Sequence, residues 1–119
     1  MEKSRKPDTI RENYLFSRVY SKGKNCTGRY VSVYYLKNRR PGGGTRLGIT
    51  VSKSRGKAVV RNRLKRRIRE SLRTLYPYMK EGYLIVTVAR QPAVGASYAQ
   101  ISEELAELLH RAALLDINE

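Results

Sequence analysis

The sequence predicts a small α+β domain, arranged as an α/β sandwich. Short runs rich in Val and Tyr, which are typical of strands, alternate with segments whose apolar residues recur at helical spacing. The chain also has 119 residues, of which 40% are hydrophobic, and this is enough to bury a core without disulfides. We therefore expect residues 1–119 to form a single domain, with a flexible polar segment at residues 1–8.

The first expected element is a helix over residues 10–21, with Asp8 or Thr9 as its N-cap. It contains two neighbouring pairs at i,i+4 spacing: Leu15 with Val19, and Phe16 with Tyr20. Because the first pair is sufficient to dock so short a helix, we expect the two aromatic side chains to remain partly exposed.

Three strands are expected, over residues 29–37, 45–52 and 83–89. Alternation in the first strand defines two faces: Val31, Val33 and Tyr35 toward the core, and Tyr30, Ser32 and Tyr34 away from it. A flexible turn follows at residues 38–44, which are rich in glycine. The last strand is almost continuously apolar, which predicts a central strand covered on both faces.

Two further helices are expected, over residues 57–76 and 96–115. In the first, a single apolar stripe is formed by Val60, Leu64, Ile68, Leu72 and Leu75. In the second, the inward residues are Ile101, Leu105, Leu108, Leu109 and Ala112. Both helices are therefore amphipathic and should pack against the sheet.

The composition excludes several classes of function. The single cysteine allows no internal disulfide and no cysteine-based zinc site, and the single histidine removes most other metal sites. No apolar run approaches the roughly 20 residues of a membrane span. The start of the sequence lacks the apolar stretch of a secretory signal, so we expect a soluble, cytoplasmic protein with no membrane partner.

Positive charge is concentrated in the first three quarters of the chain. The net charge is +15, but residues 1–90 carry +19 and residues 91–119 carry −4. A surface that binds a polyanion should therefore be built from residues 1–90. Charge alone does not distinguish RNA from DNA, an anionic membrane or an acidic protein.

The densest cationic segment is Arg61–Arg69, in which six of nine residues are Lys or Arg. On a helix these cations occupy the sides away from the apolar stripe. Arginine binds phosphate through two N–H groups, and an asparagine such as Asn62 can read a base edge or a sugar hydroxyl. A solvated helix face is the ordinary interpretation, but such faces mix signs, and here only Glu70 offsets the cations.

A second candidate feature is a group of aromatic residues: Phe16, Tyr20, Tyr30 and Tyr34. Aromatic rings beside a cationic groove commonly stack on the bases of single-stranded nucleic acid. Packing in the core is the simpler interpretation for each ring taken alone. The cationic helix expected nearby is what favours stacking.

Groups for enzymatic chemistry are nearly absent. The run Gly42–Gly44 lacks the Lys and Ser/Thr of a phosphate-binding loop, and His110 has no candidate partner. No pair of carboxylates is placed for acid–base catalysis. We therefore expect no catalytic residue and no metal-binding residue in this chain.

Three blocks in order resemble the family of ribonuclease P protein subunits. The run RLGITVSKSRGKAVVRNRLKRRIR (Arg46–Arg69) resembles the family signature: an R-x-G strand, a V-S-K exit, a G-x-A-V turn and an R-N-R-x-K-R helix. RENYLFSRVYSKG (Arg11–Gly23) resembles the first helix with its aromatic pair, and VTVARQPA (Val86–Ala93) resembles the strand followed by A-R-x-P. The similarity covers about residues 8–115.

This resemblance implies a fold like that of ribosomal protein S5 domain 2, with a left-handed β–α–β crossover where a right-handed one is usual. It implies the accessory protein subunit of an endoribonuclease that removes the 5′ leader from precursor tRNA. The RNA subunit and its Mg²⁺ ions would perform the hydrolysis. The implied partners are ribonuclease P RNA and precursor tRNA, with one protein per RNA.

Position by position, the resemblance implies two sets of binding residues. Those expected at the single-stranded leader are Phe16, Tyr20, Tyr34, Asn62, Lys65, Arg66 and Arg69. Those expected at the catalytic RNA are Lys53, Arg55, Arg61, Arg63 and Arg67. The main alternative is a ribosomal or other structural RNA-binding protein with no role in cleavage, and a self-contained nuclease is a more distant one.

Overall fold

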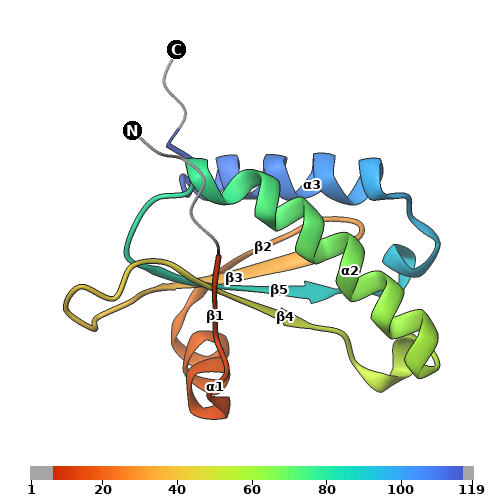
Figure 1. The fold of residues 1–119 in the computed structure, drawn as a ribbon, viewed down its shortest axis with the longest axis horizontal. Coiled ribbons are helices and arrows are strands. Elements are labelled where there is room, and N and C mark those ends of the chain that lie inside the picture. Colours follow the sequence, from red (N-terminus) through yellow and green to blue (C-terminus); the bar gives the residue numbers. More distant parts are fainter. Residues whose placement is uncertain (1–6, 117–119) are drawn as a thin grey trace.

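The computed structural model describes residues 7–116, which form a five-stranded mixed sheet with helices on both faces (Figure 1). The strands are β1 (Asp8–Thr9), β2 (Lys24–Thr27), β3 (Val31–Lys37), β4 (Arg46–Thr50) and β5 (Tyr83–Ala89). Their order across the sheet is β1-β4-β5-β3-β2. The central strand β5 pairs parallel to β4 and antiparallel to β3. The expected α+β sandwich is confirmed.

Three α-helices cover the sheet: α1 (Asn13–Lys22), α2 (Ala58–Leu75) and α3 (Tyr98–Arg111). Short 3₁₀ turns lie at η1 (Lys53–Arg55), η2 (Tyr76–Tyr78) and η3 (Gln91–Gly95). Helices α2 and α3 lie on one face of the sheet and α1 lies on the other (Figure 1). Helix α2 connects the parallel neighbours β4 and β5, which forms the expected β–α–β unit.

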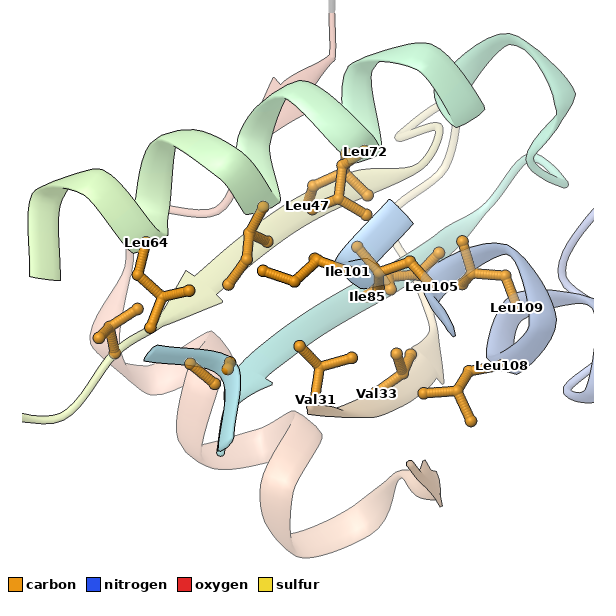
Figure 2. Packing of buried hydrophobic residues seen from close by; sticks show 14 of the residues in the cluster. Val31, Val33, Leu47, Leu64, Leu72, Ile85, Ile101, Leu105, Leu108 and Leu109 are labelled. Atoms are coloured by element: carbon orange, nitrogen blue, oxygen red, sulfur yellow. The ribbon is translucent and has the colours of Figure 1, made fainter. Parts of the chain in front are cut away.

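The larger core lies between the sheet and helices α2 and α3 (Figure 2). Most of the predicted inward residues of both helices are confirmed there: Leu64, Ile68 and Leu72 from α2, and Ile101, Leu105, Leu108 and Leu109 from α3. Leu75 and Ala112 are partly buried against this core, and Val60, near the start of α2, is not among its residues. Val31, Val33 and Ile85 meet them from the sheet. Burial of these side chains stabilises the fold by about 1.5–3 kcal/mol for each large residue.

A smaller core lies on the opposite face, beneath α1. It consists of Ile10, Val19, Leu84 and Val86, with Leu15 and Phe16 partly buried against it. Strand β5 therefore contributes alternate side chains to both cores, which confirms its predicted central position.

The N-terminal part of the chain differs from the expectation. Helix α1 begins at Asn13 with Glu12 in the capping position and no side-chain cap, so the predicted caps at Asp8 and Thr9 are wrong. Those two residues form β1 instead, and the next N–H group, of Ile10, donates to the carbonyl of Leu47 at 2.8 Å. Residues 1–6 of the segment expected to be flexible lie outside the described residues.

Strand β2 was not expected from the sequence. It pairs antiparallel with β3, and only Cys26 among its residues is partly buried. Because its side chains are polar and exposed, the hydrogen bonds to β3 determine its structure, and these are invisible to hydrophobic periodicity.

Candidate nucleic-acid interface

A cavity of about 300 Å³ lies between the N-terminal segment, β4 and α2, and we call it the α2 cleft. Its described lining consists of Pro7, Thr9, Ile10, Phe16, Leu47, Ile49, Lys65, Arg69, Leu72 and Arg73. The three cations form one wall, and no acidic residue is present in this lining. The cleft therefore combines an apolar surface with a row of positive charge that its own lining does not neutralise.

The row of cations follows from the periodicity of α2. Lys65, Arg69 and Arg73 are spaced by four residues, so they lie on one flank of the helix, while the buried stripe holds the helix against the sheet. Arg73 also pairs with Glu70, with 3.0 Å between Nη2 and Oε1. The sequence places Arg73 on the same cationic face as Lys65 and Arg69, although it was not among the residues expected at the leader.

The remaining α2 residues expected at the leader, Asn62 and Arg66, are exposed but do not line the cleft. They lie on the outer surface of the helix, next to the cationic flank. The structure therefore places Lys65 and Arg69 in the cleft itself, and Asn62 and Arg66 on the surface beside it.

Phe16 reaches the cleft because Gly48 on β4 has no side chain. A Cβ atom at Gly48 would lie 2.8 Å from both Cε1 and Cζ of the Phe16 ring, which is closer than carbon atoms approach one another. Gly48 lies within a regular strand, so its role is to leave space for the ring and not to allow an unusual backbone conformation. The ring is half-buried and packs against the smaller core at its other side.

The predicted aromatic residues Phe16, Tyr20 and Tyr34 form a contiguous row. The ring centroids of Phe16 and Tyr20 are 6.5 Å apart, and those of Tyr20 and Tyr34 are 5.1 Å apart in an edge-to-face arrangement. The Tyr20 hydroxyl is hydrogen-bonded to Oγ1 of Thr50 at 2.7 Å. Tyr20 remains 38% exposed, so its ring can contact a ligand.

Tyr30 does not belong to this row, so the expectation that it shares a face with Tyr34 is wrong. Strand β3 begins only at Val31, and the alternation of faces therefore does not extend to Tyr30. Its ring packs against the larger core, and its N–H group donates to Oε2 of Glu104 at 2.6 Å. The same carboxylate accepts the N–H groups of Arg29 at 2.9 Å and Val31 at 2.8 Å.

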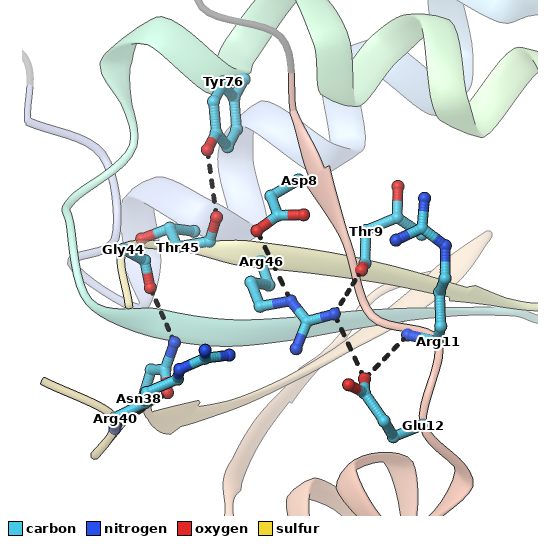
Figure 3. A network of polar contacts seen from close by, with 10 residues as sticks. All are labelled: Asp8, Thr9, Arg11, Glu12, Asn38, Arg40, Gly44, Thr45, Arg46 and Tyr76. Carbon is cyan, nitrogen blue, oxygen red and sulfur yellow. Dashed lines mark hydrogen bonds and ion pairs between the residues drawn. The ribbon is translucent and has the colours of Figure 1, made fainter. Parts of the chain in front are cut away.

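One edge of the α2 cleft is held in place by Arg46, whose side chain is only 11% exposed (Figure 3). Its Nη2 donates to the carbonyl of Thr9 at 2.6 Å and to Oε1 of Glu12 at 3.2 Å, and its Nε lies 3.6 Å from Oδ2 of Asp8. These contacts tie β1 and the start of α1 to β4. The sequence placed Arg46 in the family signature but did not reveal this role.

The same network affects the ionisation of Glu12. Hydrogen bonds from the backbone N–H groups of Glu12 itself and of Arg11 lower the pKa of this carboxyl, and Arg46 lowers it further. Burial acts in the opposite direction but is outweighed. Glu12 is therefore held as the anion that Arg46 requires.

The residues expected at the catalytic RNA lie in η1 and on α2, and two of them, Arg55 and Arg67, contact η3. Three of them donate to neighbouring groups: Arg55 Nε to the Ala89 carbonyl at 3.1 Å, Arg61 Nε to the Gly56 carbonyl at 3.0 Å, and Arg67 Nη2 to the Val94 carbonyl at 3.3 Å. A guanidinium has five N–H donors, so each retains donors for a phosphate. Lys53 and Arg63 are exposed.

Residues 7–116 contain neither a cluster of metal ligands of the usual size nor a membrane-spanning helix. No group of three His, Cys, Asp or Glu side chains in this part of the chain is arranged to hold a metal ion. No helix within the same range is both long enough and apolar enough to cross a membrane.

Comparison with known proteins gives a consistent result. The Ribonuclease P family profile matches residues 5–113. The ribonuclease P protein component of Symbiobacterium thermophilum is 40% identical over 106 residues, covering 89% of this chain and 91% of the relative. The RNase P protein of Staphylococcus aureus superimposes with a TM-score of 0.82 at 36% identity, covering 92% of this chain and 99% of the other.

The RNase P protein of Thermotoga maritima gives a TM-score of 0.77 at 30% identity, covering 87% of this chain and 96% of the other. The comparisons of sequence and of structure therefore agree over most of the chain. On this evidence the chain belongs to the Ribonuclease P protein family.

Proposed function

We propose that this chain binds the single-stranded 5′ leader of precursor tRNA in the α2 cleft, as the protein subunit of a ribonuclease P holoenzyme. Membership of the family makes it a subunit of an RNA-processing endoribonuclease. One observation supports the finer assignment: an apolar surface with an aromatic ring at its edge faces a row of three cations, and no acid is present among its described lining residues.

This geometry suits an unpaired strand better than a duplex. In a duplex the faces of each base are covered by its neighbours, whereas an unpaired base can stack on an aromatic ring. Phe16 lines the cleft together with the cations, and Tyr20 and Tyr34 extend the row of rings. Lys65 and Arg69 would then bind the phosphates of the leader. Asn62 and Arg66 would meet nucleotides that leave the cleft along α2.

The second part of the proposal concerns the RNA subunit. Lys53 and Arg55 lie in η1, and Arg61, Arg63 and Arg67 lie on α2. There they would bind the phosphates of ribonuclease P RNA. One protein would bind one RNA, in the cytoplasm. Three of these arginines are also anchored to backbone carbonyls, which would orient them before the RNA arrives.

Hydrolysis is assigned to the RNA subunit. The α2 cleft offers cations and apolar groups but no side chain that could act as a general base near neutral pH. The Mg²⁺ ions would stabilise developing negative charge on oxygen, and the described residues of this chain contain no group of three or more His, Cys, Asp or Glu arranged to hold a metal ion. We therefore place these ions on the RNA and assign the protein no step through them.

The test compares two arginines of α2 that lie on different flanks. Arg69→Gln removes a cation from the cleft, and Arg63→Gln removes an exposed cation outside it. In preassembled holoenzyme, Arg69→Gln should weaken binding of precursor tRNA by about 1–3 kcal/mol and leave binding of mature tRNA unchanged. Arg63→Gln should instead weaken assembly with the RNA subunit and affect both substrates equally once assembled.

An equal loss for precursor and mature tRNA in Arg69→Gln would show that this residue contacts the tRNA body or the RNA subunit. A second measurement tests the division of roles. Protein freed of RNA should not remove the leader, and adding ribonuclease P RNA with Mg²⁺ should restore cleavage. Leader removal by the RNA-free chain would overturn the assignment of hydrolysis to RNA.

A further inference from the structure

The single acid of helix α2 lies beside the α2 cleft. The helix carries seven Lys or Arg side chains and one carboxylate, that of Glu70. This carboxylate pairs with Arg73, the last cation of the helix, with 3.0 Å between Oε1 and Nη2. Arg73 lines the cleft, but Glu70 does not. One of the three cations of the cleft is therefore paired with an acid from outside its lining.

This pairing distinguishes Arg73 from the other two cations of the cleft. Within residues 7–116, Lys65 and Arg69 form no ion pair with an acidic side chain. The three cations are separated by four residues each, which is a rise of about 6 Å, so a strand lying along α2 would meet them in turn. The first two would present a full positive charge to it. The charge of Arg73 is already offset by Glu70.

The geometry of the helix explains how an acid outside the cleft reaches a cation inside it. Successive residues of a helix are about 100° apart, so Glu70 lies further round the helix than Arg69, beyond the edge of the cleft. Glu70 precedes Arg73 by three residues, and an acid on the N-terminal side of its partner is the orientation that the helix dipole favours.

The pair contributes little to the stability of the fold. The Arg73 side chain is 66% exposed and that of Glu70 is 47% exposed. Ion pairs between such exposed side chains are weak, because water and salt screen their attraction. The larger effect of Glu70 is therefore on the charge that Arg73 presents to a ligand.

We propose that Glu70 limits the affinity of the α2 cleft for the leader by neutralising Arg73. The inference rests on the proposed function, because it takes the leader as the ligand of the cleft. A phosphate near Arg73 also approaches the Glu70 carboxylate, and the repulsion between these two anions weakens the contact. After cleavage the leader is no longer joined to the tRNA, so a weaker contact in the cleft speeds its release.

The test compares Glu70→Gln with a matched control, Glu107→Gln. Glu107 also pairs with an arginine of its own helix, with 3.1 Å between its Oε2 and Nη2 of Arg111, and it lies on α3 outside the cleft. Each variant removes one negative charge and keeps the size of the side chain. Preassembled holoenzymes are titrated with mature tRNA and with a precursor tRNA made resistant to cleavage.

Glu70→Gln should bind the precursor about two- to fivefold more tightly, mainly through slower dissociation, and should bind mature tRNA like the parent. Glu107→Gln should change both affinities little, and both variants should melt within a few degrees of the parent. Equal gains in the two variants would reduce the effect to net charge and overturn the proposal. Weaker precursor binding by Glu70→Gln would also overturn it, since Glu70 would then position Arg73 for the leader.

Arg73→Gln tests whether Glu70 acts through its partner. In the Arg73→Gln background, Glu70→Gln should lose most of its gain, because no paired cation remains to be released. A gain of the same size in both backgrounds would show that Glu70 repels the leader directly, and it would overturn the role of Arg73.

Arg69→Gln separates a failure of this inference from a failure of the proposed function. If Arg69→Gln weakens precursor and mature tRNA equally, the leader does not occupy the cleft and both proposals fail. If Arg69→Gln weakens the precursor alone while Glu70→Gln matches its control, the leader occupies the cleft and only the role of Glu70 is wrong.

Discussion

Replacing Gly48 with alanine tests how the α2 cleft obtains its aromatic edge. The added Cβ would lie 2.8 Å from Cε1 and Cζ of Phe16 and 3.4 Å from Cγ2 of Val86. Since carbon atoms pack at about 3.5 Å or more, the Phe16 ring must retreat by about 0.7 Å. The contact with Val86 is ordinary, so the strain falls on the ring.

The expected cost combines two opposing effects. Overpacking a core costs about 1–3 kcal/mol, and replacing a strand glycine by alanine recovers about 0.5–1 kcal/mol. Phe16 is half-buried, so its ring can move toward solvent, which favours the lower part of the range. We expect Gly48→Ala to lower the free energy of unfolding by about 0.5–2 kcal/mol. Because the displaced ring is the one proposed to stack, binding of precursor tRNA should weaken more than binding of mature tRNA.

The assay is a double-mutant cycle of Gly48→Ala with Phe16→Leu. Urea unfolding gives the stability of all four proteins, and their holoenzymes are titrated with precursor and mature tRNA. In the Phe16→Leu background, alanine at position 48 should cost about 1 kcal/mol less, because leucine is narrower than the ring. An equal cost in both backgrounds would refute the reasoning, since the strain would then lie elsewhere.

Three further predictions concern contacts outside that pair. Tyr20→Phe should lower the free energy of unfolding by about 0.5–1.5 kcal/mol through loss of the Thr50 hydrogen bond, while leader affinity stays constant because the ring remains; a loss of leader affinity would assign a binding role to the hydroxyl. Folding lowers the pKa of Glu12, so its stabilising effect is present above its ordinary value of 4.5 and is lost as the pH falls through the lower folded value. Melting curves of Glu12→Gln should therefore depend less on pH in that acid range, and a profile parallel to the parent's would contradict this. Glu104→Gln should cost about 1–3 kcal/mol in unfolding experiments, because an amide cannot accept all three N–H groups held by the carboxylate; faster amide exchange at Val31 is the local check, and unaltered exchange would argue against it.

The elements that the sequence predicted well are those whose side chains decide their position. Helices α2 and α3 and strand β5 have strong apolar periodicity, and each is buried on the face or faces expected. Strand β2 has almost no apolar side chain, and β1 has only two residues, so partners far along the chain determine both. No local signal in the sequence could have identified them.

The features of the candidate site also fall into those that the sequence predicted and those that it did not. The positions of Lys65 and Arg69 were predicted from the spacing of charges on a helix, and that of Phe16 from its i,i+4 pairing with Tyr20. The opposite wall of the α2 cleft depends on Arg46 holding the N-terminal segment against β4, which is a contact between distant parts of the chain. The space for Phe16 depends on Gly48, and a glycine within a strand does not reveal which side chain will fill the space above it.

The position of β5 determines when, during synthesis, the ordered binding surfaces can form. It is the last strand along the chain but the central one in the sheet, and both cores use its side chains. A nascent chain that has not yet reached Tyr83 already contains 23 of its 25 basic residues, because only Arg90 and Arg111 remain to be added. It lacks the strand that joins β4 to β3. Ordered binding surfaces therefore arise only after most of the positive charge has left the ribosome, so an unfinished chain meets cellular RNA as a polycation without a site.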